Sequence, residues 1–141
     1  MSSKLANLIR QFGDAYDRFD DVMKQDKNEY IRDSAIQRFE FTFELAWKML
    51  KTYLEKEKGV LAYSPRDAIK GAFQVGVIED DEKWISMIET RNMTSHVYNE
   101  ATAEKVYAAL KGYLQLFKKL NEYVKNVPIL NNEERRAKKK A

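Results

Sequence analysis

The residues best suited to chemistry lie in one short segment, residues 91–100, which reads RNMTSHVYNE. It holds the single histidine of the 141-residue chain, His96, together with Arg91, Asn92 and Tyr98. A histidine can take or give a proton near neutral pH, and an arginine offers a forked, permanently charged donor that fits a phosphate. The pair suits cleavage of RNA by its own 2′-hydroxyl, in which a base removes that proton, a cation stabilises the phosphorane and an acid protonates the leaving oxygen.

One histidine cannot easily be both the base and the acid of this reaction. The second group is Tyr98, a neighbouring hydroxyl, or the His96 of a second protomer. The spacing alone is a weak signal, because a lone histidine at a helix end is more often a structural cap. Both interpretations stay open at this point.

Arg91 and His96 converge only if the helix that carries them is broken. On an unbroken helix their five-residue separation is a rotation of about 500°, which leaves the two side chains about 140° apart. The residues between and just beyond them compete for backbone hydrogen bonds and favour caps. Thr94, Ser95 and Asn99 are such residues, so the sequence predicts a break between Asn92 and Asn99 that brings both side chains to one helix end.

The remaining composition excludes several classes of site. The chain has no cysteine and one histidine, which excludes disulfide frameworks, thiolate metal sites and a multi-histidine cage within one chain. It also lacks a glycine-rich phosphate loop and an acidic calcium loop. We therefore expect no metal and no cofactor.

Charge gives little reason to expect a nucleic-acid partner. The 25 basic and 22 acidic residues leave a net charge of +3, and the final segment EERRAKKKA accounts for all of it. Short basic ends are usually solvated. No stretch approaches the roughly 18 apolar residues of a membrane span, and the N-terminus has no apolar core of a signal peptide, so we expect a soluble, cytoplasmic protein with no membrane partner.

The rest of the chain predicts helices. Glycine and proline together number 7 of 141 residues while 44% are hydrophobic, which rules out a turn-rich β-sandwich or barrel. Apolar residues recur at three- and four-residue steps. We predict an all-α fold, an antiparallel up-and-down bundle with long helices over about 3–25, 30–57 and 100–125 and two short ones between them. The bundle domain spans 1–128, and a basic C-terminal tail spans 129–141.

Short signals mark the helix ends. Gly59 ends the second helix, Ser64-Pro65-Arg66-Asp67 reads as a capping box with proline at the first helical position, and Gly76 interrupts the third. Residues 80–82, DDE, supply negative charge to the first turn of the fourth helix. The side chains expected to face inward on the short helices are Ala68, Ile69, Ala72, Phe73, Trp84, Ile85 and Ile88.

The second helix carries more apolar surface than one neighbour covers. Phe41, Leu45 and Met49 form a second apolar line beside the main one. This helix is either the centre of the bundle or also a homodimer interface, and we expect the homodimer. Charged residues at its margin, Arg38, Glu40 and Glu44, are internal ion pairs or part of a site, and structural support is the more economical interpretation.

Four features of the sequence resemble those of a known family. The pattern R-x-x-x-x-H-x-Y over residues 91–98 resembles the signature of the HEPN superfamily. The surrounding words, RFEFTFELAWK at 38–48, SPR at 64–66 and Trp84, resemble the nucleotidyltransferase substrate-binding proteins, or HepT-like toxins. The resemblance covers about residues 3–125. It implies a helical bundle that dimerises so that two motifs share one cleft, and a small partner nucleotidyltransferase acting as antitoxin.

The resemblance also implies an activity and roles for the motif residues. Members of the superfamily act as metal-independent endoribonucleases, and the partner can silence the toxin by AMPylation of the motif tyrosine. Arg91 would hold the scissile phosphate of the RNA substrate, His96 would be the base or acid, Asn92 would orient His96 or contact the substrate, and Tyr98 would accept AMP. The alternative function is a non-catalytic substrate-binding subunit of a two-component nucleotidyltransferase.

Overall fold

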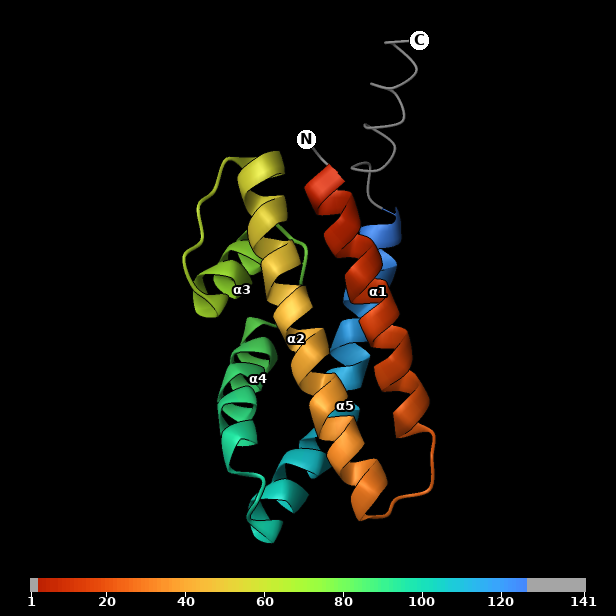
Figure 1. The fold of residues 1–141 in the computed structure, drawn as a ribbon. Helices are drawn as coiled ribbons and strands as arrows, with labels where there is room; N and C mark the ends of the chain where they lie inside the picture. Colours follow the sequence, from red (N-terminus) through yellow and green to blue (C-terminus); the bar gives the residue numbers. More distant parts are fainter. Residues whose placement is uncertain (1–2, 127–141) are drawn as a thin grey trace.

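Five α-helices and one 3₁₀ turn form the part of the chain that this computed structural model describes, residues 3–126 (Figure 1). No strand occurs within this range, which confirms the predicted all-α class. The predicted basic tail over 129–141 lies outside the described residues. The elements are α1 (Ser3–Met23), α2 (Glu29–Lys58), α3 (Pro65–Gln74), α4 (Asp81–Met93), the 3₁₀ turn η1 (Thr94–His96) and α5 (Glu100–Asn126).

The helices form an antiparallel bundle in which one of the four columns is divided. In Figure 1, α1 runs down beside α2, α2 runs up, α3 and α4 follow one another on the left, and α5 returns upward behind α2. Helix α2 contacts α1, α3 and α5, while α4 packs against α3 and α5. The predicted arrangement of three long and two short helices is confirmed.

The ends of α2 and the start of α3 follow the local sequence signals. Gly59 ends α2 with a positive φ of 65° and donates its N–H to the Leu54 carbonyl. The Ser64 hydroxyl accepts the Asp67 N–H at 3.1 Å, and the Asp67 carboxylate accepts the Tyr63 N–H at 3.2 Å. The capping box therefore forms, with its return bond one residue before the cap.

The turn from α3 to α4 uses the predicted residues as well. Gly76 has a φ of 82°, a backbone conformation in which a side chain would be strained. The Asp80 side chain accepts the Lys83 N–H at 3.1 Å and so caps α4. These two residues separate α3 and α4 into distinct helices.

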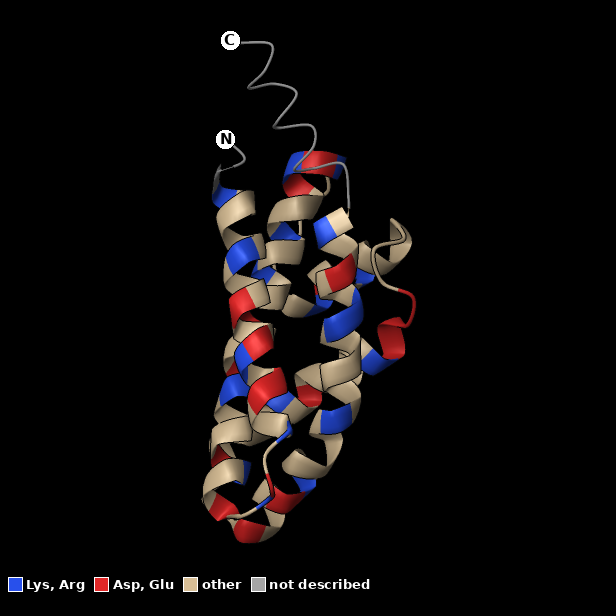
Figure 2. Ribbon diagram, turned by 90° about the vertical axis from the view of Figure 1, so that its right-hand side faces the viewer, with Lys and Arg blue, Asp and Glu red and all other residues tan. Residues whose placement is uncertain are grey.

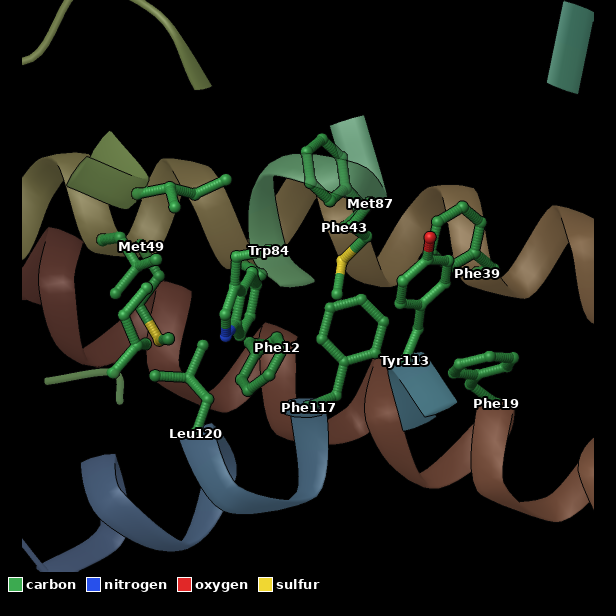
Figure 3. Close-up of a cluster of buried hydrophobic side chains, with 14 of the residues drawn as sticks. Phe12, Phe19, Phe39, Phe43, Met49, Trp84, Met87, Tyr113, Phe117 and Leu120 are labelled. Atoms are coloured by element: carbon green, nitrogen blue, oxygen red, sulfur yellow. The ribbon is translucent and has the colours of Figure 1, made fainter. Parts of the chain in front are cut away.

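Aromatic side chains from four helices meet in the centre of the bundle (Figure 3). Phe39 and Tyr113 stack with ring centroids 5.5 Å apart, and Phe117 meets Phe12 edge-on at 6.0 Å and Trp84 at 5.7 Å. Such offset and edge-on arrangements are the favoured geometries of aromatic pairs. This cluster joins α1, α2, α4 and α5 and holds α4, the carrier of Arg91, on the bundle.

One inward assignment on the short helices is wrong, because Phe73 is 44% exposed. Ile85 and Ile88 are partly buried and pack against the core, and Met87 beside them is fully buried. The buried side of α3 is made of Ala68, Ile69, Gly71 and Ala72. A side-chain carbon at Gly71 would lie 2.8 Å from Leu54 Cδ1, so α3 and α2 approach closely at Gly71.

Helix α2 is the central helix of the chain, which accounts for much of its wide apolar arc. Met49 is fully buried and Leu45 partly buried within one chain. Phe41 remains 48% exposed. The expected burial on two sides is thus met largely inside the bundle, and the homodimer stays a prediction that rests on the exposed Phe41.

The outer surface of the bundle is polar. Figure 2 shows acidic and basic residues interspersed along the helices in that view. Within residues 3–126, none of the helices is both long enough and apolar enough to span a membrane.

Candidate functional site

The predicted break lies between α4 and α5, and side-chain hydroxyls produce it. The Thr94 hydroxyl donates to the Arg91 carbonyl at 2.6 Å, and the Ser95 hydroxyl donates to the Asn92 carbonyl at 3.1 Å. The Asn99 side chain then accepts a backbone N–H from the first turn of α5 at 3.1 Å. These side chains form hydrogen bonds with backbone carbonyl and N–H groups at the helix ends. The α-helix therefore ends and a 3₁₀ turn follows.

Arg91, in the last turn of α4, is tied to α2. Its Nε and Nη2 lie 3.1 and 2.9 Å from the same oxygen of Glu44, Oε1. The other oxygen of Glu44, Oε2, accepts the indole N–H of Trp47 at 3.1 Å. The Arg91 side chain is still 39% exposed, so part of the guanidinium remains open to solvent.

His96 is the last residue of the 3₁₀ turn, Tyr98 lies two residues beyond it, and both side chains are exposed. Tyr98 is 84% exposed, and His96 is exposed too. The His96 Nδ1 and the Tyr98 hydroxyl are 3.4 Å apart, a long contact, with the two rings edge-on at 5.9 Å. Within residues 3–126 the His96 ring bonds no backbone carbonyl, and the role of His96 stays a prediction.

The four motif residues thus fall into two groups. Arg91 pairs with Glu44, and His96 contacts Tyr98, but in the described part of the chain no hydrogen bond joins one pair to the other. Asn92 is exposed beside Arg91. Among residues 3–126, no three histidine, aspartate or glutamate side chains lie close enough together to hold a metal ion.

The three charged residues singled out on α2 have different surroundings. Arg38 donates to the Arg18 carbonyl at 2.8 Å and so ties α2 to α1. Glu40 makes no hydrogen bond or ion pair through its side chain within the described residues. Glu44 is the one of the three that contacts a motif residue.

A second ionic cluster, which the sequence interpretation missed, fixes the start of α5. The buried Arg32 side chain, 5% exposed, reaches both oxygens of Glu100 at 2.7 and 3.1 Å and Glu104 at 3.1 Å. The guanidinium lowers the pKa of Glu100, and Lys27 and Arg32 together lower the pKa of Glu104. The available signal was an arginine in register with the core positions Ile36 and Phe39.

The sequence was compared with known protein families and with known proteins. The family model described as "Nucleotidyltransferase substrate binding protein like" matches residues 4–126. A Haemophilus influenzae protein named "Probable ribonuclease HepT" is 38% identical over 84 residues, which is 57% of this chain and 58% of that protein. The chain thus aligns with less than two thirds of that relative's length.

Two solved structures share the fold. A Haemophilus influenzae protein with the fold of a substrate binding domain of a nucleotidyltransferase is 27% identical, with 89% of this chain and 100% of that chain covered and a TM-score of 0.65. A tri-AMPylated HEPN toxin from Shewanella oneidensis, in complex with an MNT antitoxin, has a TM-score of 0.69 over 90% of this chain and 100% of that chain. At 20% identity it shows the fold alone. The bundle, the motif at the α4–α5 break and the family match agree, and the chain belongs to the family of nucleotidyltransferase substrate-binding-like proteins.

Proposed function

We propose that this protein is the toxin of a toxin–antitoxin pair and cuts RNA without a metal ion. The observation that carries the proposal is the helix break, which leaves Arg91 partly exposed in the last turn of α4 and His96 exposed at the end of the 3₁₀ turn that follows. The H. influenzae relative named "Probable ribonuclease HepT" supports the same activity.

In the proposed reaction the ribose 2′-oxygen attacks the adjacent phosphorus. A base takes the 2′-hydroxyl proton, the bond from phosphorus to the 5′-oxygen breaks, and an acid gives that oxygen a proton. The products are a 2′,3′-cyclic phosphate and a 5′-hydroxyl. Arg91 stabilises the charge that develops on the phosphorane oxygens, and His96 serves as the base or the acid.

The second proton-transfer group is Tyr98 or the His96 of a second protomer. Tyr98 supports the first option because its hydroxyl contacts His96. A homodimer built on the exposed face of α2 around Phe41 supports the second. Light scattering at micromolar concentration should give twice the 16.6 kDa chain mass. A 16.6 kDa species would contradict the shared cleft.

A partner minimal nucleotidyltransferase is proposed as the antitoxin. Support comes from the family description and from the S. oneidensis complex of an AMPylated HEPN toxin with an MNT antitoxin. Tyr98 is the proposed acceptor of AMP, because its hydroxyl is exposed next to His96.

The test is RNA cleavage by the purified protein, without a partner and with a chelator present. The proposal predicts fragments that carry a cyclic phosphate at one end and a 5′-hydroxyl at the other. Intact RNA, or cleavage that the chelator abolishes, would contradict it.

A second candidate is a non-catalytic subunit that presents a substrate to a nucleotidyltransferase. The H. influenzae structure with a substrate binding domain fold, 27% identical, favours it. In that case the purified protein leaves RNA intact, yet its addition raises the rate at which the partner transfers AMP to a substrate.

A further inference from the structure

The carboxylate of Glu44 is divided between two partners on two helices. Its Oε1 accepts from Nε and Nη2 of Arg91 on α4, and its Oε2 accepts from the Trp47 indole one turn further along α2. We infer that Glu44 is a positioning residue, held by Trp47, that orients the Arg91 guanidinium for a phosphate. This inference rests on the proposed RNA cleavage.

The pairing uses one edge of the guanidinium and leaves the other edge available. Arginine has five N–H donors, and Glu44 engages the Nε side. Within residues 3–126, Nη1 of Arg91 has no hydrogen-bond or ion-pair partner. The edge formed by Nη1 and the second Nη2 hydrogen can therefore take two oxygens of a phosphate at once, the geometry for which arginine is suited.

Arg91 needs such an external tie because of its place in the chain. It lies in the last turn of α4, where the Thr94 hydroxyl takes its carbonyl and the helix ends. A long, half-exposed arginine also has many rotamers to lose when it binds a ligand. An acceptor fixed on another helix removes that freedom before the substrate arrives, which favours the transition state.

Glu44 is a suitable anchor because α2 is the central helix and its neighbouring side chains are fixed. Thr42, Phe43 and Ala46 are buried around it. The Trp47 bond then restrains the carboxylate itself. With both oxygens committed, Glu44 holds Arg91 and leaves proton transfer to other groups.

The Glu44 and Arg91 side chains are both partly exposed, and an ion pair between partly exposed side chains contributes little to the stability of the fold. A purely structural role for Glu44 and a positioning role therefore predict different results. The structural role predicts unchanged chemistry in the folded protein, whereas the positioning role predicts a loss of kcat with little change in the unfolding temperature. Glu44→Ala removes the tie, Glu44→Gln keeps an acceptor oxygen but loses the charge, and Trp47→Phe removes the hydrogen bond that restrains the carboxylate.

A matched control is available on the same helix. Glu55 lies 11 residues beyond Glu44, a rotation of about 20° from it, on the same side of α2 and three turns away. It is exposed and makes no ion pair within the described residues. Glu55→Gln makes the same charge change as Glu44→Gln away from Arg91.

The experiment measures single-turnover RNA cleavage, dimer mass and Tm for each variant. Glu44→Ala should lower the rate at saturating enzyme by about 10- to 100-fold. Glu44→Gln and Trp47→Phe should lower it less, and Glu55→Gln should match wild type. A wild-type protein that cleaves RNA while Glu44→Ala cleaves it equally well overturns the inference and leaves the proposed function standing.

A second readout does not depend on activity. The Arg91 Nε–H signal in a nitrogen-edited NMR spectrum, assigned by its loss in Arg91→Lys, should exchange with water faster in Glu44→Ala than in wild type or Glu55→Gln. An unchanged exchange rate overturns the inference. A loss of activity that follows a lost dimer or a lowered Tm in both Glu44→Ala and Glu44→Gln also overturns it, because the role is then structural. Failure of the wild-type protein to cleave RNA overturns the proposed function instead, whatever the NMR shows, and this inference with it.

Discussion

Arg91 and Tyr98 differ in solvent exposure, and the difference suits them to different roles. Arg91 is half-covered and fixed by an ion pair, which suits a group that must meet a phosphate in one orientation. Tyr98 has most of its surface in solvent and a single long contact to His96. A side chain so open can enter the active site of another enzyme.

Replacing Tyr98 with phenylalanine tests its role as the AMP acceptor. AMP on Tyr98 would bring a negative charge close to Arg91 and His96 and would repel an RNA phosphate. Incubation with the partner nucleotidyltransferase, ATP and magnesium should add AMP to the wild-type protein, as seen in intact mass, and should abolish RNA cleavage. Tyr98→Phe should lose the addition and keep cleavage. If Tyr98→Phe is inactive on RNA, Tyr98 belongs to the acid-base pair instead.

At the scale of elements, ion pairs between side chains hold the start of α5 in place. The Arg32 side chain on α2 is buried against Glu100 and Glu104, and Lys27 from the α1–α2 connection also pairs with Glu104. Glu100 follows directly after the segment that carries His96 and Tyr98. The cluster therefore fixes one border of that segment while the hydroxyl caps of α4 fix the other.

Acid should weaken this anchor. The pKa values of Glu100 and Glu104 are lowered below the usual 4.5 in the folded protein, so folding gains stability from both groups above that pH. The gain is lost as the pH falls through the lowered folded values. Urea unfolding from pH 7 to pH 3 should show a steeper loss of stability below pH 4.5 for wild type than for a Glu100→Gln, Glu104→Gln double variant. Equal slopes would contradict the ionic anchor.

The close approach of α3 to α2 gives a second prediction at this scale. Alanine at Gly71 would press its methyl group against the fully buried Leu54, an overpacking that costs about 1–3 kcal/mol. Gly112 on α5 has open space, so Gly112→Ala should gain about 0.5–1 kcal/mol of helix stability. Thermal unfolding should place the Gly71→Ala variant below wild type and the Gly112→Ala variant above it. A stabilised Gly71→Ala variant would show that the α2–α3 contact can relax.

At the scale of the molecule, local signals predicted the fold well. Gly59, Ser64 and Gly76 set helix ends because caps and positive φ values depend on a few neighbouring residues. The helix break was predictable from Thr94 and Ser95 for the same reason. Each of these features depends on interactions between residues close together in the chain, so it can be predicted from the local sequence.

Features that depend on contacts between distant segments were not predictable. Glu44 and Arg91 are 47 positions apart, and helical periodicity assigns each a face but no partner. Phe73 was assigned inward because its spacing matches Ile69, yet Phe73 is 44% exposed while Ile69 is fully buried. Arg32 stands at a core position, where a buried charge needs partners, and two of these, Glu100 and Glu104, lie on the distant α5.

The most direct test of the account is RNA cleavage by Arg91→Ala and His96→Ala beside wild type, with a chelator present and Tm measured in parallel. Each substitution should lower the cleavage rate by about 100-fold or more, because each removes a group that acts in the transition state. Tm should change little, since both side chains are partly or wholly exposed. Wild-type rates in both folded variants would contradict the assignment of Arg91 and His96 as the residues that cut RNA.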